Sequence, residues 1–177
     1  MARLVRRLTT RFASAAIERD FAEIKARLDR KVFGRLEVYG NPLFSGDVVG
    51  GLQQLKSAFP YGFGLIQRYI RCVVESDTPN RAKGSGIGVV YQKVTRECRL
   101  PYPPERYAAF LVRRAAALRR WRYDIWNSAR SELAGASLEL RAMRKLGCDP
   151  QQFHFVTNQI LRYERLIKKG VGSRLLK

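Results

Sequence analysis

This sequence has almost no histidine, and none of its cysteines lie close together along the chain. Its 177 residues contain one histidine, His154, and three cysteines, Cys72, Cys98 and Cys148, which lie far apart and form no C-x-x-C pair. Zinc ribbons and disulfide scaffolds need paired cysteines at close spacing, so both are excluded, as is a histidine-rich metal site. Neither a G-x-S-x-G nor an H-E-x-x-H motif occurs. The sequence therefore predicts a protein that is not an enzyme, with no catalytic residues, no metal site and no cofactor.

Acidic residues are scarce, and no long apolar run is present. The chain has 15 Asp and Glu against 34 Lys and Arg, a formal net charge of +19, and 25 of these basic residues are arginine. A fold with this imbalance repels itself, which favours a polyanionic partner such as nucleic acid or an acidic membrane surface. Arginine pairs bidentately with phosphate, so its excess favours ordered phosphate contacts. Because no apolar stretch approaches the roughly 18 residues of a membrane-spanning helix, we expect a soluble or peripheral protein with no transmembrane segment.

The first sixteen residues, MARLVRRLTTRFASAA, contain no acid. They carry three hydroxyl side chains and four arginines, which are Arg3, Arg6, Arg7 and Arg11. This composition is typical of a mitochondrial transit peptide, and the alternative is a basic arm that binds RNA and is not an import signal. We favour import and expect the protein in the mitochondrial matrix. The four arginines are also candidate RNA-binding residues.

Helical periodicity dominates the rest of the chain. Apolar residues recur at helical spacing over residues 17–33, 47–58, 64–75 and 105–146, and a last helix is expected after Asp149-Pro150. Gly135 is a candidate break in the longest of these helices, and weak alternation predicts one short strand over residues 89–94. The expected fold class is mainly α: several amphipathic helices with an extended basic N-terminal arm (1–16), a helical region (17–88) and a long C-terminal helical extension (89–177).

The longest predicted helix carries five arginines within ten residues. They are Arg113, Arg114, Arg119, Arg120 and Arg122. Residues six to eight positions apart on a helix lie about 9 to 12 Å apart along its axis, which is comparable with phosphate spacing across a nucleic-acid groove. Only Asp124 is close enough along the helix to offset this charge. We expect these arginines to contact phosphate, while an acidic protein partner and an ordinary solvated face stay open as alternatives.

Two further features bear on nucleic acid. Trp121, Tyr123 and Trp126 interleave with the arginines and could stack on unpaired bases, although packing in a core or interface is the commoner use of such side chains. The glycine-rich segment 81–88 lacks the spacing of a nucleotide-binding loop. Its Arg81 and Lys83 are better suited to a basic loop that lies against RNA, and we take both as candidate RNA-binding residues.

Four short motifs occur in a set order in the first half of the chain. They are A-R-L-D-R-K-V-F-G at 26–34, Y-G-N-P at 39–42, L-Q-Q-L-K-S-A-F-P at 52–60 and R-A-K-G at 81–84. Together they resemble the landmarks of the mitochondrial small-subunit ribosomal protein thirty-three family, over about residues 22–88. The resemblance implies a small helical protein in the head of the mitochondrial small ribosomal subunit, among ribosomal RNA and neighbouring mitochondrial ribosomal proteins. It implies no catalytic role and does not extend to the C-terminal half.

These observations favour a structural component of the mitochondrial small ribosomal subunit. We expect it to bind rRNA phosphates through its arginines and to pack its apolar helix faces on neighbouring proteins, with no small-molecule substrate. The alternative is an accessory structural subunit of a respiratory-chain or ATP-synthase complex, in which a basic helix lies on anionic lipid.

Overall fold

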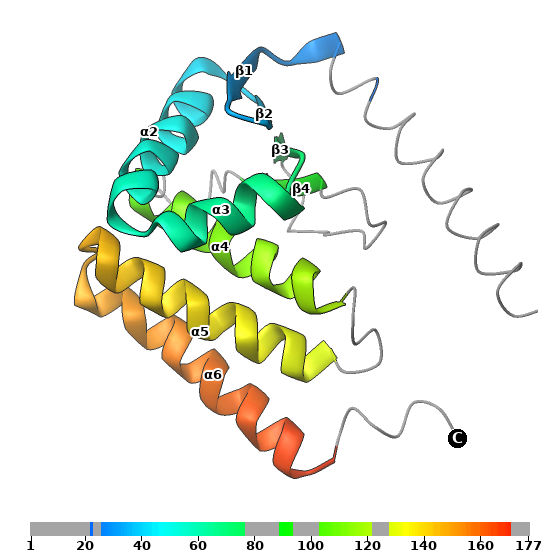
Figure 1. Ribbon diagram of the computed structural model, residues 1–177, viewed down its shortest axis with the longest axis vertical. Helices are drawn as coiled ribbons and strands as arrows, with labels where there is room; N and C mark the ends of the chain where they lie inside the picture. Colours follow the sequence, from blue (N-terminus) through cyan, green and yellow to red (C-terminus); the bar gives the residue numbers. More distant parts are fainter. Residues whose placement is uncertain (1–21, 23–25, 77–88, 94–102, 122–127, 171–177) are drawn as a thin grey trace, which may run out of the picture.

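Helices make up most of the computed structural model, which describes residues 22, 26–76, 89–93, 103–121 and 128–170 (Figure 1). The prediction of a mainly α fold is confirmed. Five α-helices lie within the described residues: α2 (Pro42–Ala58), α3 (Pro60–Tyr69), α4 (Pro104–Trp121), α5 (Ser128–Leu146) and α6 (Phe153–Lys168). A short 3-10 turn, Pro150–Gln152, precedes α6.

A small mixed sheet stands at one end of the helices (Figure 1). Its four strands are β1 (Arg30–Phe33), β2 (Leu36–Tyr39), β3 (Cys72–Ser76) and β4 (Val89–Lys93), in that spatial order. β1 and β2 form an antiparallel hairpin, while β2, β3 and β4 run parallel. The predicted strand over 89–94 is confirmed, but the predicted helix over 17–33 is wrong at its end, because residues 30–33 form β1.

Gly34 is the reason that the chain reverses between β1 and β2. Its φ of +62° is a left-handed conformation that suits glycine. The side chain of Gln67, on α3, then fixes the turn, since its Oε1 accepts the Arg35 amide at 2.7 Å and its Nε2 donates to the Phe33 carbonyl at 3.2 Å. The hairpin is therefore tied to a helix far along the chain.

Asn41 and Pro42 start α2, which begins earlier than the predicted 47–58. The Asn41 side chain accepts the Phe44 amide at 2.9 Å, and Pro42 occupies the first helical turn, where its missing N–H is not needed. Asn41 also donates to both carboxylate oxygens of Glu75 on β3, through its backbone at 2.6 Å and its side chain at 2.7 Å. Residues 39–42 thus form the junction between β2 and α2.

The predicted helix over 64–75 ends early, at Tyr69. Residues 72–76 form β3 instead, in which Val73 and Val74 pair with Val38 and Tyr39 of β2. Valines are stiff at χ1 and pack well in a sheet whose two faces are both covered, and the residues of β3 from Cys72 to Val74 are buried. Pairing with two neighbouring strands therefore outweighs the helical spacing of the apolar residues.

The predicted helix over 105–146 is two helices, α4 and α5, which pack side by side (Figure 1). Gly135 does not break or bend the chain: it lies inside α5, where a Cβ would stand 2.8 Å from the carbonyl oxygen of Arg113. The junction between the two helices falls in residues 122–127, outside the described part. Gly147, with φ +70°, ends α5, and Asp149 caps the turn before α6, so the predicted last helix is confirmed.

One hydrophobic core joins the sheet to all five helices. α4 contacts α2, α3 and α5, and α5 lies between α4 and α6 (Figure 1). A Cβ at Gly51 of α2 would lie 1.9 Å from the Pro104 carbonyl oxygen, so only glycine allows these two helices their close approach. The largest fully buried apolar side chains of this core are Tyr107, Leu36, Leu52, Leu55, Ile66, Leu111 and Met143.

Candidate nucleic-acid interface

The fold separates acidic from basic side chains. Nine acidic residues are described, and only Asp29, Asp149 and Glu164 among them are exposed. By contrast, sixteen of the nineteen basic residues whose side chains are described are exposed: Arg27, Arg30, Lys31, Arg35, Lys56, Arg68, Arg71, Arg119, Arg130, Arg141, Arg144, Lys145, Arg162, Arg165, Lys168 and Lys169. The surface of this part of the chain is thus even more basic than its composition.

Some of the acidic residues that are not exposed pair with arginine inside the helical bundle. Arg113 of α4 has a side chain only 9% exposed, and it reaches Glu132 at 2.9 Å and Glu139 at 3.2 Å, both on α5. It also donates to Gln159 and to the Tyr163 hydroxyl, both on α6. Arg113 thus bonds to side chains of both neighbouring helices.

Two more arginines complete this group. The guanidinium of Arg106 lies 3.4 Å from Glu139, and that of Arg114 lies 3.8 Å from Glu132. We call Arg106, Arg113, Arg114, Glu132 and Glu139 the buried charge cluster. Three guanidinium groups share two carboxylates, so the cluster binds the helices together without contributing acid to the surface.

Burial and pairing act in opposite directions on the pKa values in the buried charge cluster. Burial by itself lowers the pKa of Arg113, but its hydrogen bond to Glu132 and the charges of Glu139 and Glu132 outweigh this effect, and the pKa is raised. Burial raises the pKa of Glu139, against the opposing charges of Arg113 and Arg106. Burial lowers the pKa of Arg114, and Glu132 offsets this only in part.

Two members of the predicted arginine surface are therefore turned inward. Arg113 is buried and neutralised by carboxylates from α5, and Arg114 packs its guanidinium 5.6 Å from the ring centre of Phe110. Spacing along one helix gives no sign of Glu132 and Glu139, because both lie on α5 and reach Arg113 only through the packing of the two helices. For Arg113 the expectation of a phosphate contact is wrong, because its side chain is only 9% exposed and its guanidinium is paired with Glu132 and Glu139.

Arg119 belongs to a different surface, which sequence reasoning did not find. It is exposed, and its Nη1 donates to the Tyr61 hydroxyl of α3 at 2.7 Å. The Tyr61 ring lies 5.9 Å from the Phe59 ring, and the guanidinium of Arg141 on α5 stands 5.4 Å from the centre of Phe59. We call Arg119, Tyr61, Phe59 and Arg141 the arginine–aromatic ladder. It includes residues of three helices, so no pattern within one stretch of the sequence predicts it.

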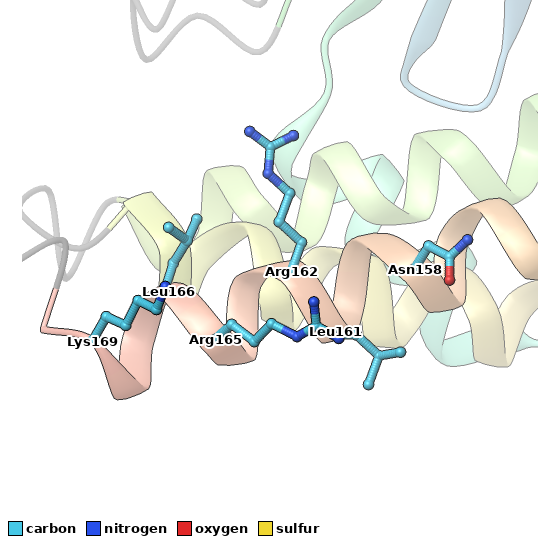
Figure 2. A pocket seen from close by; sticks show the side chains of 6 residues that line it. All are labelled: Asn158, Leu161, Arg162, Arg165, Leu166 and Lys169. Carbon is cyan, nitrogen blue, oxygen red and sulfur yellow. The ribbon is translucent and has the colours of Figure 1, made fainter.

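A second basic surface runs along α6. A hollow of about 300 Å³ is lined by five residues of this helix and by Lys169, which directly follows it: Asn158, Leu161, Arg162, Arg165, Leu166 and Lys169 (Figure 2). In this view Arg162 and Leu161 extend in opposite directions from the helix (Figure 2). Phe155 and Leu161 are exposed on α6 as well, at 64% and 44%. The exposed surface of α6 therefore carries both cations and uncovered apolar side chains.

The remaining candidate RNA-binding residues lie beyond what the structure describes. Arg3, Arg6, Arg7, Arg11, Arg81, Lys83 and Arg122 fall in residues outside the described ranges, and the side chain of Arg120 is likewise not described. The same holds for the aromatic side chains of Trp121, Tyr123 and Trp126. Their contacts with RNA stay predictions.

No metal-binding group and no membrane-spanning helix is found in the described ranges. Groups of three or more His, Cys, Asp or Glu side chains that could hold a metal ion do not occur there, nor does any described helix have the length and apolar character to cross a bilayer. Cys72 and Cys148 are buried, and burial raises the pKa of Cys148 to about 11. Comparisons of the chain with protein-family models, with curated proteins and with solved structures find no match.

Proposed function

We propose that this chain is a structural component of the mitochondrial small ribosomal subunit that binds rRNA and acts as a brace between RNA and neighbouring proteins. The observation that carries the proposal is the separation of charge: within the described residues, sixteen basic side chains are exposed and only three acidic ones are. Such a surface repels itself unless a polyanion neutralises it. Phosphate is the ligand for which an arginine-rich surface is best suited.

The role that we propose is architectural rather than enzymatic. The exposed cations are spread over the hairpin, α3, α5 and α6 rather than gathered in one cleft. This distribution suits a protein that touches RNA phosphates at several places and fixes relative positions. The ribosomal assignment, as opposed to another ribonucleoprotein, rests on the resemblance of residues 22–88 to the mitochondrial small-subunit ribosomal protein thirty-three family, and the matrix location rests on the composition of residues 1–16.

Binding of the full chain to a structured ribosomal RNA fragment at a series of salt concentrations tests the proposal. We expect the logarithm of the association constant to fall linearly with the logarithm of salt concentration, because each neutralised phosphate releases counterions. A variant with Arg162, Arg165 and Lys169 changed to glutamine should show a shallower slope. A wild-type affinity that is equal at low and high salt would contradict phosphate binding.

The α6 face favours one alternative. Exposed Phe155 and Leu161 beside Arg162, Arg165 and Lys168 suit a helix that lies on anionic lipid, as in an accessory subunit of a respiratory-chain or ATP-synthase complex. Fractionation of detergent-treated mitochondria separates the two functions. Co-sedimentation with ribosomal subunits that ribonuclease abolishes supports the brace, whereas migration with an inner-membrane complex after ribonuclease treatment supports the alternative.

A further inference from the structure

Tyr61 is an aromatic residue whose side chain stays exposed to solvent in the fold. It stands in the first turn of α3 and is 51% exposed, although Phe59, two residues earlier, is 6% exposed. Exposed large aromatics are unusual, because burying such a side chain stabilises a fold by about 1.5 to 3 kcal/mol. The exposed ring of Tyr61 is therefore available to a ligand.

The ring is held in place from two directions. Its hydroxyl oxygen accepts a 2.7 Å hydrogen bond from Arg119 of α4, and its ring lies against Phe59 at a centroid distance of 5.9 Å and an interplanar angle of 50°. Phe59 is itself buried and covered by the guanidinium of Arg141, 5.4 Å from its ring centre. A ring that is already fixed loses little entropy when a flat ligand stacks on it.

The surroundings of Tyr61 are cationic. Arg119 and Arg141 belong to the arginine–aromatic ladder, and Lys56 is exposed on the last turn of α2. Among the described residues no exposed acid lies on α3, α4 or α5. A fixed, open ring whose hydroxyl is bonded to Arg119, next to a Phe59 ring covered by Arg141, combines a stacking platform with cations for the adjoining backbone. Proteins hold unpaired nucleotides in this way.

We propose that the arginine–aromatic ladder is a binding site for an unpaired RNA nucleotide, with its base stacked on Tyr61 and the flanking phosphates paired with Arg119 and Arg141. This inference rests on the proposed RNA-binding function and names the kind of RNA that the site takes: a loop, bulge or strand end. A continuous duplex offers no free base face, so it gains nothing from Tyr61.

Two fluorescent RNA probes test the site: a hairpin with an unpaired adenine-rich loop and a fully paired duplex with the same number of nucleotides. The variant Tyr61→Leu keeps an apolar contact with Phe59 but has no aromatic face. We expect its affinity for the loop probe to fall about 5- to 150-fold, the range reported by alanine substitution for one stacked base, with no change for the duplex. Tyr61→Trp should bind the loop as the wild type does.

Phe155→Ala is the matched control, because Phe155 is also an exposed aromatic but lies on α6, a helix that carries its own exposed arginines, Arg162 and Arg165. It should bind both probes as the wild type does, and an equal loss in Phe155→Ala and Tyr61→Leu overturns the assignment to Tyr61. Photo-crosslinking of the wild type to a loop that carries 5-iodouracil gives a second readout, in which the crosslinked peptide should contain Tyr61. If the wild type binds both probes with steep salt dependence but neither variant nor crosslink points to Tyr61, the site is refuted and RNA binding stands. If it binds neither probe, the proposed function fails too.

Discussion

Arg113 and Arg119 are the same residue type on the same helix, six positions apart, and the fold uses them in opposite ways. The side chain of Arg113 is 9% exposed and bonds to two glutamates of α5 and to two side chains of α6. Arg119 is exposed, and the only partner that the structure gives it within the described residues is the hydroxyl of Tyr61. One arginine serves the interior of the bundle, and the other is available to a ligand.

The difference shows that the density of arginines in a sequence does not measure a binding surface. The carboxylates that neutralise Arg113 are 19 and 26 residues away, and the packing of α5 against α4 brings them to it. A buried ion pair costs desolvation energy and stabilises a fold only when its hydrogen bonds are well satisfied. The buried charge cluster therefore joins α4 to α5, and Arg113 also bonds to α6, whereas both arginines of the arginine–aromatic ladder are exposed.

The largest expected effect comes from removing the buried arginine. Arg113→Met should lower the free energy of unfolding by about 3 to 5 kcal/mol, because it leaves Glu139 buried with Arg106 alone and leaves Glu132 with Arg114. Urea unfolding followed by circular dichroism measures this loss. Arg119→Met should change stability by no more than about 0.5 kcal/mol, as expected for a surface site.

A second variant separates lost pairing from poor packing of the new methionine. Adding Glu139→Gln to Arg113→Met removes the buried carboxylate that has lost Arg113 as a partner, so part of the lost stability should return. If Arg113→Met and Arg119→Met lower the free energy of unfolding by the same amount, the contrast between the two arginines is wrong.

A smaller loss of stability is expected from Gly135→Ala. A Cβ there would stand 2.8 Å from the Arg113 carbonyl oxygen and 3.1 Å from its Cγ, so α5 must move away from α4 and from the ion pairs between them. We expect a loss of about 1 to 3 kcal/mol in urea unfolding. Gly64→Ala is the control: it lies in α3 with nothing within 4 Å of a new Cβ, and alanine should stabilise that helix by roughly 0.5 to 1 kcal/mol. Destabilisation of both variants to the same degree would show that close packing at Gly135 is not the cause.

The exposed arginines should affect RNA binding and leave stability nearly unchanged. Arg119→Gln and Arg141→Gln should each make the salt dependence shallower by about one unit of slope if each loses one phosphate contact. Fluorescence anisotropy with the loop hairpin at several salt concentrations measures the slope, and a melting curve confirms that the fold is intact. Arg68→Gln is the comparison. This exposed arginine lies in the last turn of α3, whereas Tyr61 lies in the first, and it is outside the arginine–aromatic ladder. A slope that is unchanged in both ladder variants would contradict their role in binding phosphate.

Much of the helical fold could be predicted from sequence, because α2, α4, α5 and α6 each repeat their apolar residues over several turns. Of the sheet only β4 was predicted, since its strands have four or five residues and β2 and β3 meet only after the chain has passed through α2 and α3. The site was predicted in part. Periodicity placed Arg113 and Arg119 on one helix, but what surrounds each of them depends on α3 and α5, and Tyr61 lies 58 positions from the arginine that holds it.

The smallest expected effect is on the pH dependence of stability. Burial raises the pKa of Glu139 in the fold, so the folded chain keeps this proton at pH values where the unfolded chain, with a glutamate pKa of about 4.3, has lost it. The wild type should therefore lose stability relative to Glu139→Gln as the pH rises from about 4 through the raised pKa. Urea unfolding of both proteins at several pH values measures the difference, in which the other carboxylates cancel. An opposite trend, with the wild type gaining on the variant as pH rises, would mean that Arg106 and Arg113 outweigh burial, and that the charged form of Glu139 is a net source of stability rather than a cost of joining these helices.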